Sequence, residues 1–179
     1  MNSTNLSNTI NLLQSNKTIA IVGHKNPDGD AVGSCLGLFH FLKNRGFNVT
    51  VVMPNDFPEF LKWLPGCDTI INFEKHLEEV TSVIENAEVI FTLDFNALNR
   101  TGGLGEVLEQ AKAKFIMIDH HQQPDDYAIA SYSDVTMSST CEMVYHFIEK
   151  LQGKNEITPE IATNLYAGIM TDTGSFRFP

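Results

Sequence analysis

Short apolar runs alternate with amphipathic stretches along most of this chain of 179 residues. Five runs have the composition of buried strands, and segments with helical periodicity separate them. This alternation predicts an α/β fold with a five-stranded, mainly parallel sheet and helices on both faces. The predicted strands are Thr18–Val22, Val49–Met53, Thr69–Phe73, Val89–Leu93 and Phe115–Ile118, with an added edge strand at Tyr127–Tyr132. The predicted helices are Ala31–Asn44, Lys75–Asn86, Leu104–Ala113, Ser139–Leu151 and Pro159–Met170.

The composition indicates one globular, acidic domain. Hydrophobic residues make up 42% of the chain, and no internal repeat or linker interrupts the pattern. The formal net charge is −10, from 12 basic and 22 acidic residues. This balance argues against a surface that follows long duplex nucleic acid or an anionic membrane.

The cysteines and the N-terminal residues indicate the cellular compartment of the protein. Cys35, Cys67 and Cys141 are odd in number and form no C-x-x-C pair, which argues against a disulfide framework or a zinc ribbon. The N-terminal stretch lacks a basic segment followed by an apolar one, and no apolar run approaches the ~20 residues of a membrane span. We therefore expect a cytoplasmic protein that is not bound to a membrane.

Acidic and histidine side chains follow three of the predicted strands. Because the carboxyl ends of parallel strands form the ligand-binding edge of an open sheet, these side chains are expected to lie together. A fourth set follows the last predicted helix in the stretch Thr171-Asp172-Thr173-Gly174. The other three sets are His24, Asp28 and Asp30; Asp94; and Asp119, His120 and His121.

Clustered carboxylates indicate bound cations, since nearby like charges that are partly desolvated disfavour ionisation. Oxygen-rich ligands with a few imidazoles suit Mn²⁺ or Mg²⁺ better than a tetrahedral zinc site. Each set alone also has an ordinary interpretation as a helix cap or a polar turn, and Asp94 by itself would more often be one of these. The coincidence of all four sets is what predicts a two-metal site.

Together these segments resemble the four motifs of the DHH phosphoesterase superfamily. The resemblance rests on HKNPDGDAVGS, the strand end at Asp94, Asp119-His120-His121 and GIMTDTGSFRFP, in the expected order. Within the superfamily, Gly29, Gly33 and Ser34 beside Asp30, and the ending Gly174-Ser175-Phe176-Arg177-Phe178, resemble one branch. This branch contains bifunctional oligoribonucleases and phosphatases of 3′-phosphoadenosine 5′-phosphate (PAP), and also exopolyphosphatase-related proteins. This resemblance implies a Rossmann-like DHH domain over residues 1–179.

The resemblance also implies roles for single residues. One Mn²⁺ would be held by His24 and Asp28, and Asp94 would bridge to a second Mn²⁺ held by Asp30, His120 and Asp172. Mg²⁺ or another divalent ion is the alternative. His121 would face the substrate phosphate, and Asp119 would orient a histidine. Arg100 resembles an arginine near this motif in relatives and would either contact a phosphate or be a solvated surface residue. Backbone N–H groups at the helix start from Ala31 to Ser34 would contact a phosphate, and Ser138, Ser139 and Thr140 would either bind substrate or cap a helix.

The implied activity is a hydrolase that cleaves short oligoribonucleotides or PAP with a metal-activated water. A manganese-dependent inorganic pyrophosphatase, an exopolyphosphatase and a single-strand exonuclease remain as alternatives. Members of this branch usually continue into a smaller DHHA1 domain, for which this sequence contains no motif. A noncatalytic module that binds metal or nucleotide is therefore the alternative from another class.

Overall fold

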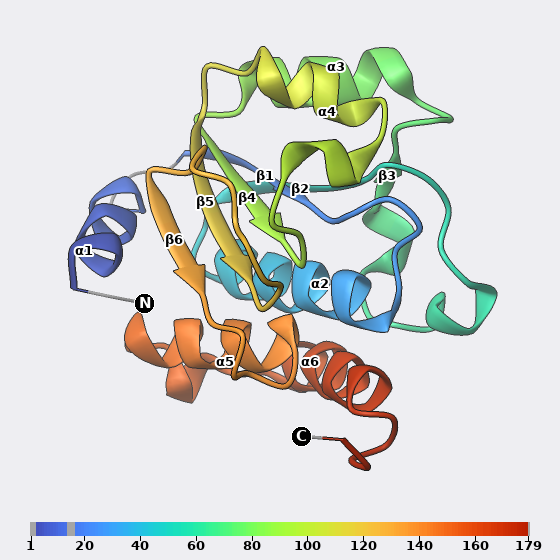
Figure 1. The fold of residues 1–179 in the computed structure, drawn as a ribbon, viewed down its shortest axis with the longest axis vertical. Helices are drawn as coiled ribbons and strands as arrows, with labels where there is room; N and C mark the ends of the chain where they lie inside the picture. The colour runs from blue at the N-terminus through green and yellow to red at the C-terminus, as the bar shows by residue number, and fades with distance from the viewer. Residues whose placement is uncertain (1–2, 14–16, 179) are drawn as a thin grey trace.

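The sheet has the predicted α/β architecture. The computed structural model describes residues 3–13 and 17–178 of the chain (Figure 1). Within these residues one six-stranded sheet has the order β3-β2-β1-β4-β5-β6, and every neighbouring pair is parallel. The sixth strand lies at the edge that the sequence indicated, shifted toward the C-terminus. The strands are β1 (Thr18–Val22), β2 (Asn48–Met53), β3 (Ile71–Asn72), β4 (Val89–Leu93), β5 (Lys114–Asp119) and β6 (Ala130–Ser133).

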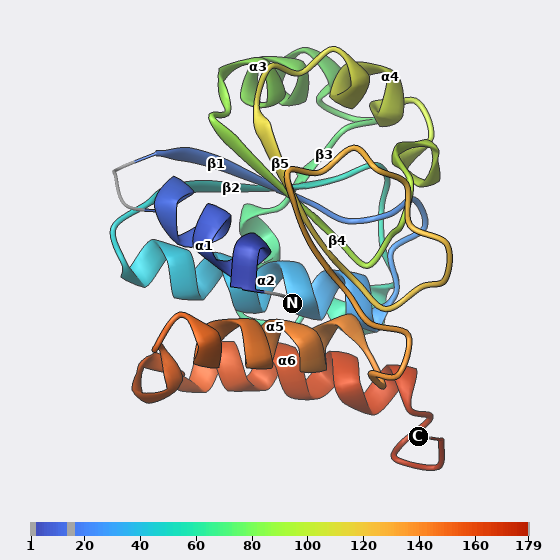
Figure 2. The same ribbon diagram turned by 60° about the vertical axis from the view of Figure 1, so that its left-hand side comes forward.

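Helices cover both faces of the sheet, as Figure 2 shows: α3 and α4 lie on one face, and α2, α5 and α6 lie on the other. The bounds are α1 (Ser3–Leu12), α2 (Gly29–Asn44), α3 (Leu77–Asn86), α4 (Leu104–Glu109), α5 (Thr140–Lys150) and α6 (Pro159–Asp172). Four 3₁₀ turns connect elements of the described chain, at Glu59–Leu61, Cys67–Thr69, Leu98–Thr101 and Lys154–Glu156. No helix in the described ranges combines the length and the apolar character needed to cross a bilayer.

The strands are apolar along their whole length because both faces of the sheet are buried. Side chains alternate between two cores. In β1, Ile19 and Ile21 enter the core beneath α2, α5 and α6, whereas Ala20 and Val22 enter the core beneath α3 and α4. The continuous apolar runs in the sequence therefore reflect burial on both sides.

The helix α1 is absent from the sequence-based prediction. Its residues, STNLSNTINL, are mostly polar and include few strong helix formers. The Asn5 amide donates to the Ser131 carbonyl oxygen at 2.6 Å, and the Asn8 amide donates to the Ile129 carbonyl oxygen at 3.3 Å. Local propensity favours this helix only weakly. It is held by contacts with β6 and the residue before it, which lie far away in the sequence.

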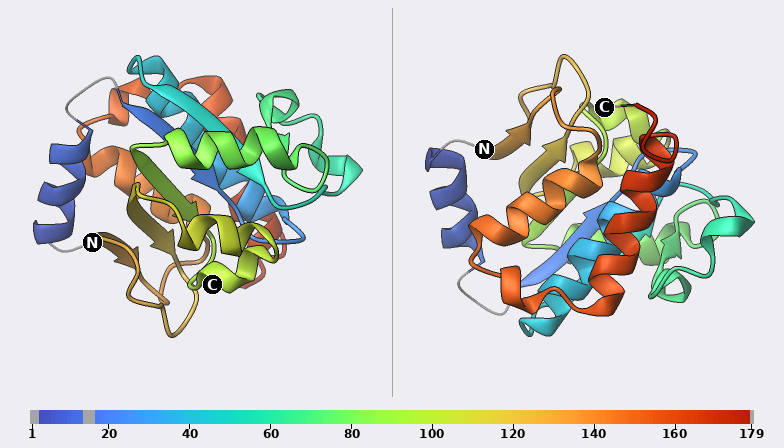
Figure 3. Two further views of the ribbon diagram at one scale, coloured as in Figure 1. Left: turned by 90° about the horizontal axis from the view of Figure 1, so that it is seen from above. Right: turned by 90° about the horizontal axis from the view of Figure 1, so that it is seen from below.

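Helices α2 and α6 pack closely because small residues line their contact. A Cβ atom on Gly33 of α2 would lie 2.5 Å from the backbone oxygen of Asn164 in α6, and one on Gly37 would meet the Leu165 side chain at 2.5 Å. The view from below in Figure 3 shows α5 and α6 side by side across α2. This packing brings the end of α6, with Asp172, to the start of α2.

The strand order places a ligand-binding edge at the centre of the sheet. The connections from β1 run to β2 on one side, and β4 adjoins β1 on the other side. In open parallel sheets, such a reversal of strand order opens a crevice beyond the carboxyl ends of the strands. His24, Asp94 and Asp119 lie at or just after the ends of β1, β4 and β5, as the sequence predicts.

Candidate metal centre

The loop after β1 turns directly into α2. Oδ1 of Asp28 accepts hydrogen bonds from the backbone N–H groups of Asp30 and Ala31, both at 3.0 Å, so Asp28 is the N-cap of the helix. Close packing of this turn on α6 requires Gly29, since a Cβ there would meet the Thr171 side chain. Only Oδ1 of Asp28 accepts these capping hydrogen bonds, and Oδ2 takes no part in them.

His24 is held with its Nε2 atom toward two carboxylates. Its Nδ1 lies 2.8 Å from the Lys25 carbonyl oxygen. Its Nε2 lies 3.4 Å from Oδ2 of Asp94 and 3.8 Å from Oδ1 of Asp28. Burial of the ring lowers its pKa, but the hydrogen bonds to Asp28 and Asp94 outweigh burial and raise the pKa to about 10. The surroundings of His24 therefore favour a positive charge at this point of the site.

Asp94 lies at the centre of the site. It is 2% exposed and adopts a left-handed backbone with φ 66°, directly after β4. Its two carboxylate oxygens face different partners: Oδ2 lies toward His24, and Oδ1 lies 3.6 Å from Nε2 of His120. The same Oδ1 accepts a hydrogen bond from the Thr140 hydroxyl at 2.9 Å.

A second group of ligand atoms comes from α2, β5 and α6. Nε2 of His120 lies 3.4 Å from Oδ2 of Asp172 and 3.9 Å from Oδ2 of Asp30. Burial, followed by the charge of Asp94, raises the pKa of Asp30 well above its usual range. Burial also raises the pKa of Asp172, with smaller contributions from Asp94 and Asp28. A cation would relieve this crowding of carboxylates.

His121 and Asp119 form a pair beside the two groups. Nδ1 of His121 donates to Oδ1 of Asp119 at 2.7 Å, and the backbone N–H of His121 donates to the other oxygen at 3.1 Å. Asp119 is fully buried, whereas the His121 side chain is 36% exposed. The hydrogen bond to Asp119 raises the pKa of His121. The pair therefore presents a partly exposed, protonatable ring at the mouth of the site.

The structure corrects the expectation for the start of α2. The helix begins at Gly29, two residues earlier than predicted, and Ser34 in its second turn is fully buried. The Asp28 side chain takes the N–H groups of Asp30 and Ala31, its carbonyl oxygen accepts from Val32 at 3.1 Å, and the Ser34 hydroxyl donates to the Ala31 carbonyl oxygen. The N–H groups of Asp30, Ala31 and Val32 therefore have acceptors within the protein, and the Ser34 side chain is enclosed, which counts against a direct contact of these groups with a phosphate.

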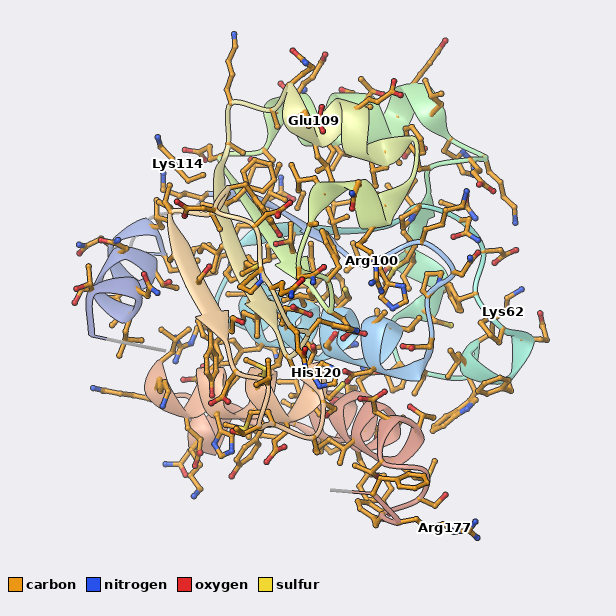
Figure 4. All side chains as sticks on the ribbon, in the orientation of Figure 1. Lys62, Arg100, Glu109, Lys114, His120 and Arg177 are labelled. Carbon is orange, nitrogen blue, oxygen red and sulfur yellow. The ribbon has the colours of Figure 1, made fainter. Side chains whose placement is uncertain are left out.

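Arg100 lies in the turn Leu98–Thr101 after β4, and its carbonyl oxygen accepts from the Lys25 N–H at 2.9 Å. Figure 4 labels both Arg100 and His120; His120 lies between the end of β5 and the helices α5 and α6. The charge of Arg100 reaches His121, whose pKa it lowers slightly. Arg100 therefore lies near enough to His121 to affect its charge, and its contact with a phosphate stays a prediction.

Sequence reasoning left two parts of the centre unassigned. The sequence predicts Thr140 as a substrate contact or a helix cap, whereas its contact with Asp94 depends on the position of α5. Asn55 accepts the backbone N–H of Asn26 at 2.7 Å and donates to the Asn26 side chain at 2.9 Å, which holds the left-handed turn of the loop after β1. The one sequence signal for this contact is an asparagine two residues after the end of β2.

Three sets of side chains in the described chain have ligand atoms within 4.8 Å of one another: His24, Asp28 and Asp94; Asp30, His120 and Asp172; and Asp94, His120 and His121. Asp94 belongs to the first set, and its Oδ1 lies 3.6 Å from Nε2 of His120 in the second set. The donors of these two sets are carboxylate oxygens with one imidazole each, which suits Mn²⁺ or Mg²⁺. The hydrogen bonds at Nδ1 of His24 and His120 leave Nε2 of each ring toward the carboxylates. The residues present therefore fit divalent ions.

Comparisons with known proteins agree with this architecture. The chain is 35% identical over 160 residues to the bifunctional oligoribonuclease and PAP phosphatase NrnA of Thermus thermophilus, over 89% of this chain and 44% of that protein. It superimposes on an exopolyphosphatase-related protein from Bacteroides fragilis with TM-score 0.97 and 38% identity, over 99% of this chain and 52% of that one. The fold is also shared with Thermus thermophilus RecJ in complex with Mn²⁺, at TM-score 0.56 and 15% identity, over 94% and 24% of the two chains.

The chain therefore spans about half the length of the curated relatives it matches. The model of the DHH family, N-terminal domain, matches residues 18–169. This stretch contains the sheet from β1 to β6 and nearly every side chain of the centre, with Asp172 just beyond it. By this match and by its fold, the chain belongs to the DHH family.

Proposed function

We propose that this chain is a metal-dependent phosphoesterase domain that hydrolyses short oligoribonucleotides, PAP or both. The observation that carries the proposal is Asp94, a buried carboxylate with one oxygen toward each of the two sets of ligand atoms. Such sharing is the arrangement that a two-ion hydrolase requires. The resemblance to NrnA supports the choice of substrate.

His24, Asp28 and Asp94 would hold one Mn²⁺, and Asp30, His120 and Asp172 would hold the other together with Asp94. When bound, such ions lower the pKa of water and neutralise phosphoryl oxygens. The protein itself keeps the ligands in place through the cap at Asp28 and the hydrogen bonds of His24 and His120. Because neutralisation is local, the net charge of −10 does not prevent a short polyanion from binding.

His121 has the properties of a group that contacts the substrate. Its ring is partly exposed, and the hydrogen bond from Nδ1 to Asp119 fixes the orientation of the ring, while the second oxygen of Asp119 accepts from the His121 backbone N–H. The carboxylate keeps the proton on Nδ1, so Nε2 is the atom free to face a phosphate oxygen. In its protonated form, favoured by Asp119, the ring donates a hydrogen bond and a positive charge to that oxygen.

The proposal is tested by incubating the protein with Mn²⁺ and, separately, a labelled diribonucleotide, PAP and inorganic pyrophosphate. Release of mononucleotide or of phosphate from PAP, abolished by EDTA and by Asp172→Asn, is expected. His146→Ala is the matched control, because that histidine pairs with Glu149 on α5, outside the centre. Absence of turnover on both nucleotide substrates contradicts the proposal. Faster release of phosphate from pyrophosphate favours the pyrophosphatase alternative.

A further inference from the structure

We propose that Thr140 is a positioning residue that orients the shared carboxylate of Asp94 and ties it to Asp30. The inference deepens the proposed function, on which it rests, by assigning a role to a residue that is not itself a metal ligand. It starts from the position of Thr140, which is fully buried and is the first residue of α5. Both its hydroxyl and its backbone N–H are directed at acidic ligands.

The hydroxyl contacts Asp94. The distance from Oγ1 of Thr140 to Oδ1 of Asp94 is 2.9 Å, and the ionised carboxylate only accepts, so the hydroxyl donates. This bond opposes rotation of the carboxylate about its Cβ–Cγ bond. Oδ2 is thereby kept toward His24, while Oδ1 retains a free lone pair toward His120.

The backbone at the same position contacts Asp30. The N–H of Thr140 donates to Oδ2 of Asp30 at 2.6 Å, and the N–H of Cys141 donates to Oδ1 at 2.8 Å. Asp30 is 1% exposed, and these two bonds fix the plane of its carboxylate. The partial positive charge at the start of α5 further stabilises the ionised form. One residue therefore sets the relative orientation of two acidic ligands that come from different elements.

Helix capping does not account for the Thr140 hydroxyl. Ser139 is the N-cap of α5, because its Oγ accepts the N–H of Glu142 at 3.1 Å. The Glu142 carboxylate in turn accepts from the N–H and the hydroxyl of Ser138 at 2.9 and 2.8 Å. The helix end is complete without the Thr140 side chain, so the bond to Asp94 is a separate feature.

Three variants separate positioning from stability. Thr140→Val removes the hydroxyl at almost the same volume, Thr140→Ser retains a hydroxyl, and Ser139→Ala removes the cap while leaving the bond to Asp94. The readouts are the affinity and stoichiometry for Mn²⁺ by titration calorimetry, the melting temperature without metal, and kcat and KM on the diribonucleotide. The calorimetric readout is independent of hydrolysis.

Thr140→Val is expected to weaken Mn²⁺ binding by about 10–100-fold, as for other groups that orient metal ligands. In an active protein, kcat should fall with little change in KM, and Thr140→Ser should restore both affinity and kcat. Ser139→Ala should lower the melting temperature and leave Mn²⁺ affinity unchanged. Wild-type Mn²⁺ affinity in Thr140→Val overturns the inference, as does equal loss of affinity in Ser139→Ala. Absence of hydrolysis by the wild-type protein contradicts the proposed function alone, because metal binding still tests Thr140.

Discussion

Nε2 of His24 lies 3.4 Å from Oδ2 of Asp94, although the two residues follow different strands that are distant in the sequence. Parallel pairing of β1 and β4 brings them together, with Val22 in register with Thr92. The contact joins the loop after β1 to the central carboxylate of the site. In the proposed function, this is the point where a divalent cation would replace the proton on the His24 ring.

Replacing Asp94 by asparagine tests whether both sets of ligands depend on it. Asparagine tolerates the left-handed backbone at this position and preserves the shape of the side chain. Loss of the charge should reduce Mn²⁺ occupancy below two ions. Hydrolysis should fall by more than the ~10–100-fold typical of changes outside the ligand sphere. Retention of two ions with near-normal hydrolysis contradicts the shared-carboxylate assignment.

His121→Ala should give the opposite pattern. The residue is assigned to the substrate, so two Mn²⁺ ions should remain bound while kcat falls by about 10²–10³-fold, as for loss of one electrostatic stabiliser. Mn²⁺ titration and steady-state kinetics on one sample measure both effects. Loss of an ion in this variant would contradict the assignment of His121 to the substrate. It would indicate instead that His121 binds a metal ion together with Asp94 and His120.

Metal binding should release protons at neutral pH. The pKa of His24 is raised to about 10 without metal, so at pH 7.5 its ring is protonated, and Mn²⁺ must displace that proton. The buffer takes up each released proton. The binding heats measured in HEPES and in Tris should therefore differ by the number of protons released multiplied by the difference between the two ionisation enthalpies. Mn²⁺ affinity should rise with pH up to about 10. Equal heats in both buffers refute a protonated His24.

The same shift predicts how the stability of the metal-free protein depends on pH. Because the folded-state pKa lies above the ordinary value of 6.5, the protonated ring contributes its full stabilisation below about pH 6.5. This contribution declines as pH rises toward 10. Urea unfolding across this range in EDTA should show the decline, and it should be smaller in His24→Gln.

Gly33→Ala should separate α2 from α6. The added Cβ would lie 2.5 Å from a backbone oxygen of α6, which cannot move as a flexible side chain can. Overpacking of this kind costs about 1–3 kcal/mol, and Mn²⁺ binding should weaken because Asp30 and Asp172 lie on the two helices. Gly103→Ala is the control, since its Cβ would meet Phe73 at an ordinary 3.6 Å. Denaturant unfolding and Mn²⁺ titration compare them, and equal stability of the two variants counts against the packing argument.

Arg45→Ala tests a contact that stabilises the fold away from the site. Its guanidinium donates to both oxygens of Glu156 at 2.8 and 2.7 Å and to the Leu151 carbonyl oxygen at 3.0 Å. It also lies over the Phe41 ring at 4.3 Å. Partial exposure of the pair limits the expected loss to about 1 kcal/mol. Chemical denaturation measures it; Mn²⁺ affinity should not change, and a change would indicate coupling between this contact and the centre.

The sequence alone was enough to predict the central strands and the chemistry at their ends. Continuous apolar runs identify strands that are buried on both faces, and β1 and β4 have the predicted bounds. The spacing of His24, Asp28 and Asp30 within one loop is local, so it could be recognised without a structure. Parallel strands align their carboxyl ends, which accounts for the placement of His24, Asp94 and His120 at one edge, whereas the packing of α6 on α2 brings Asp172 there.

Only the tertiary structure decided which groups contact one another across the sequence. It placed α1 against β6, gave the N–H groups of Asp30, Ala31 and Val32 acceptors within the protein, and put Thr140 between Asp94 and Asp30. These outcomes depend on how helices pack and where a helix begins, which periodicity defines only approximately. A threonine at the start of a helix has the same local pattern whether it caps that helix or orients a carboxylate, so contacts between distant elements determine its role.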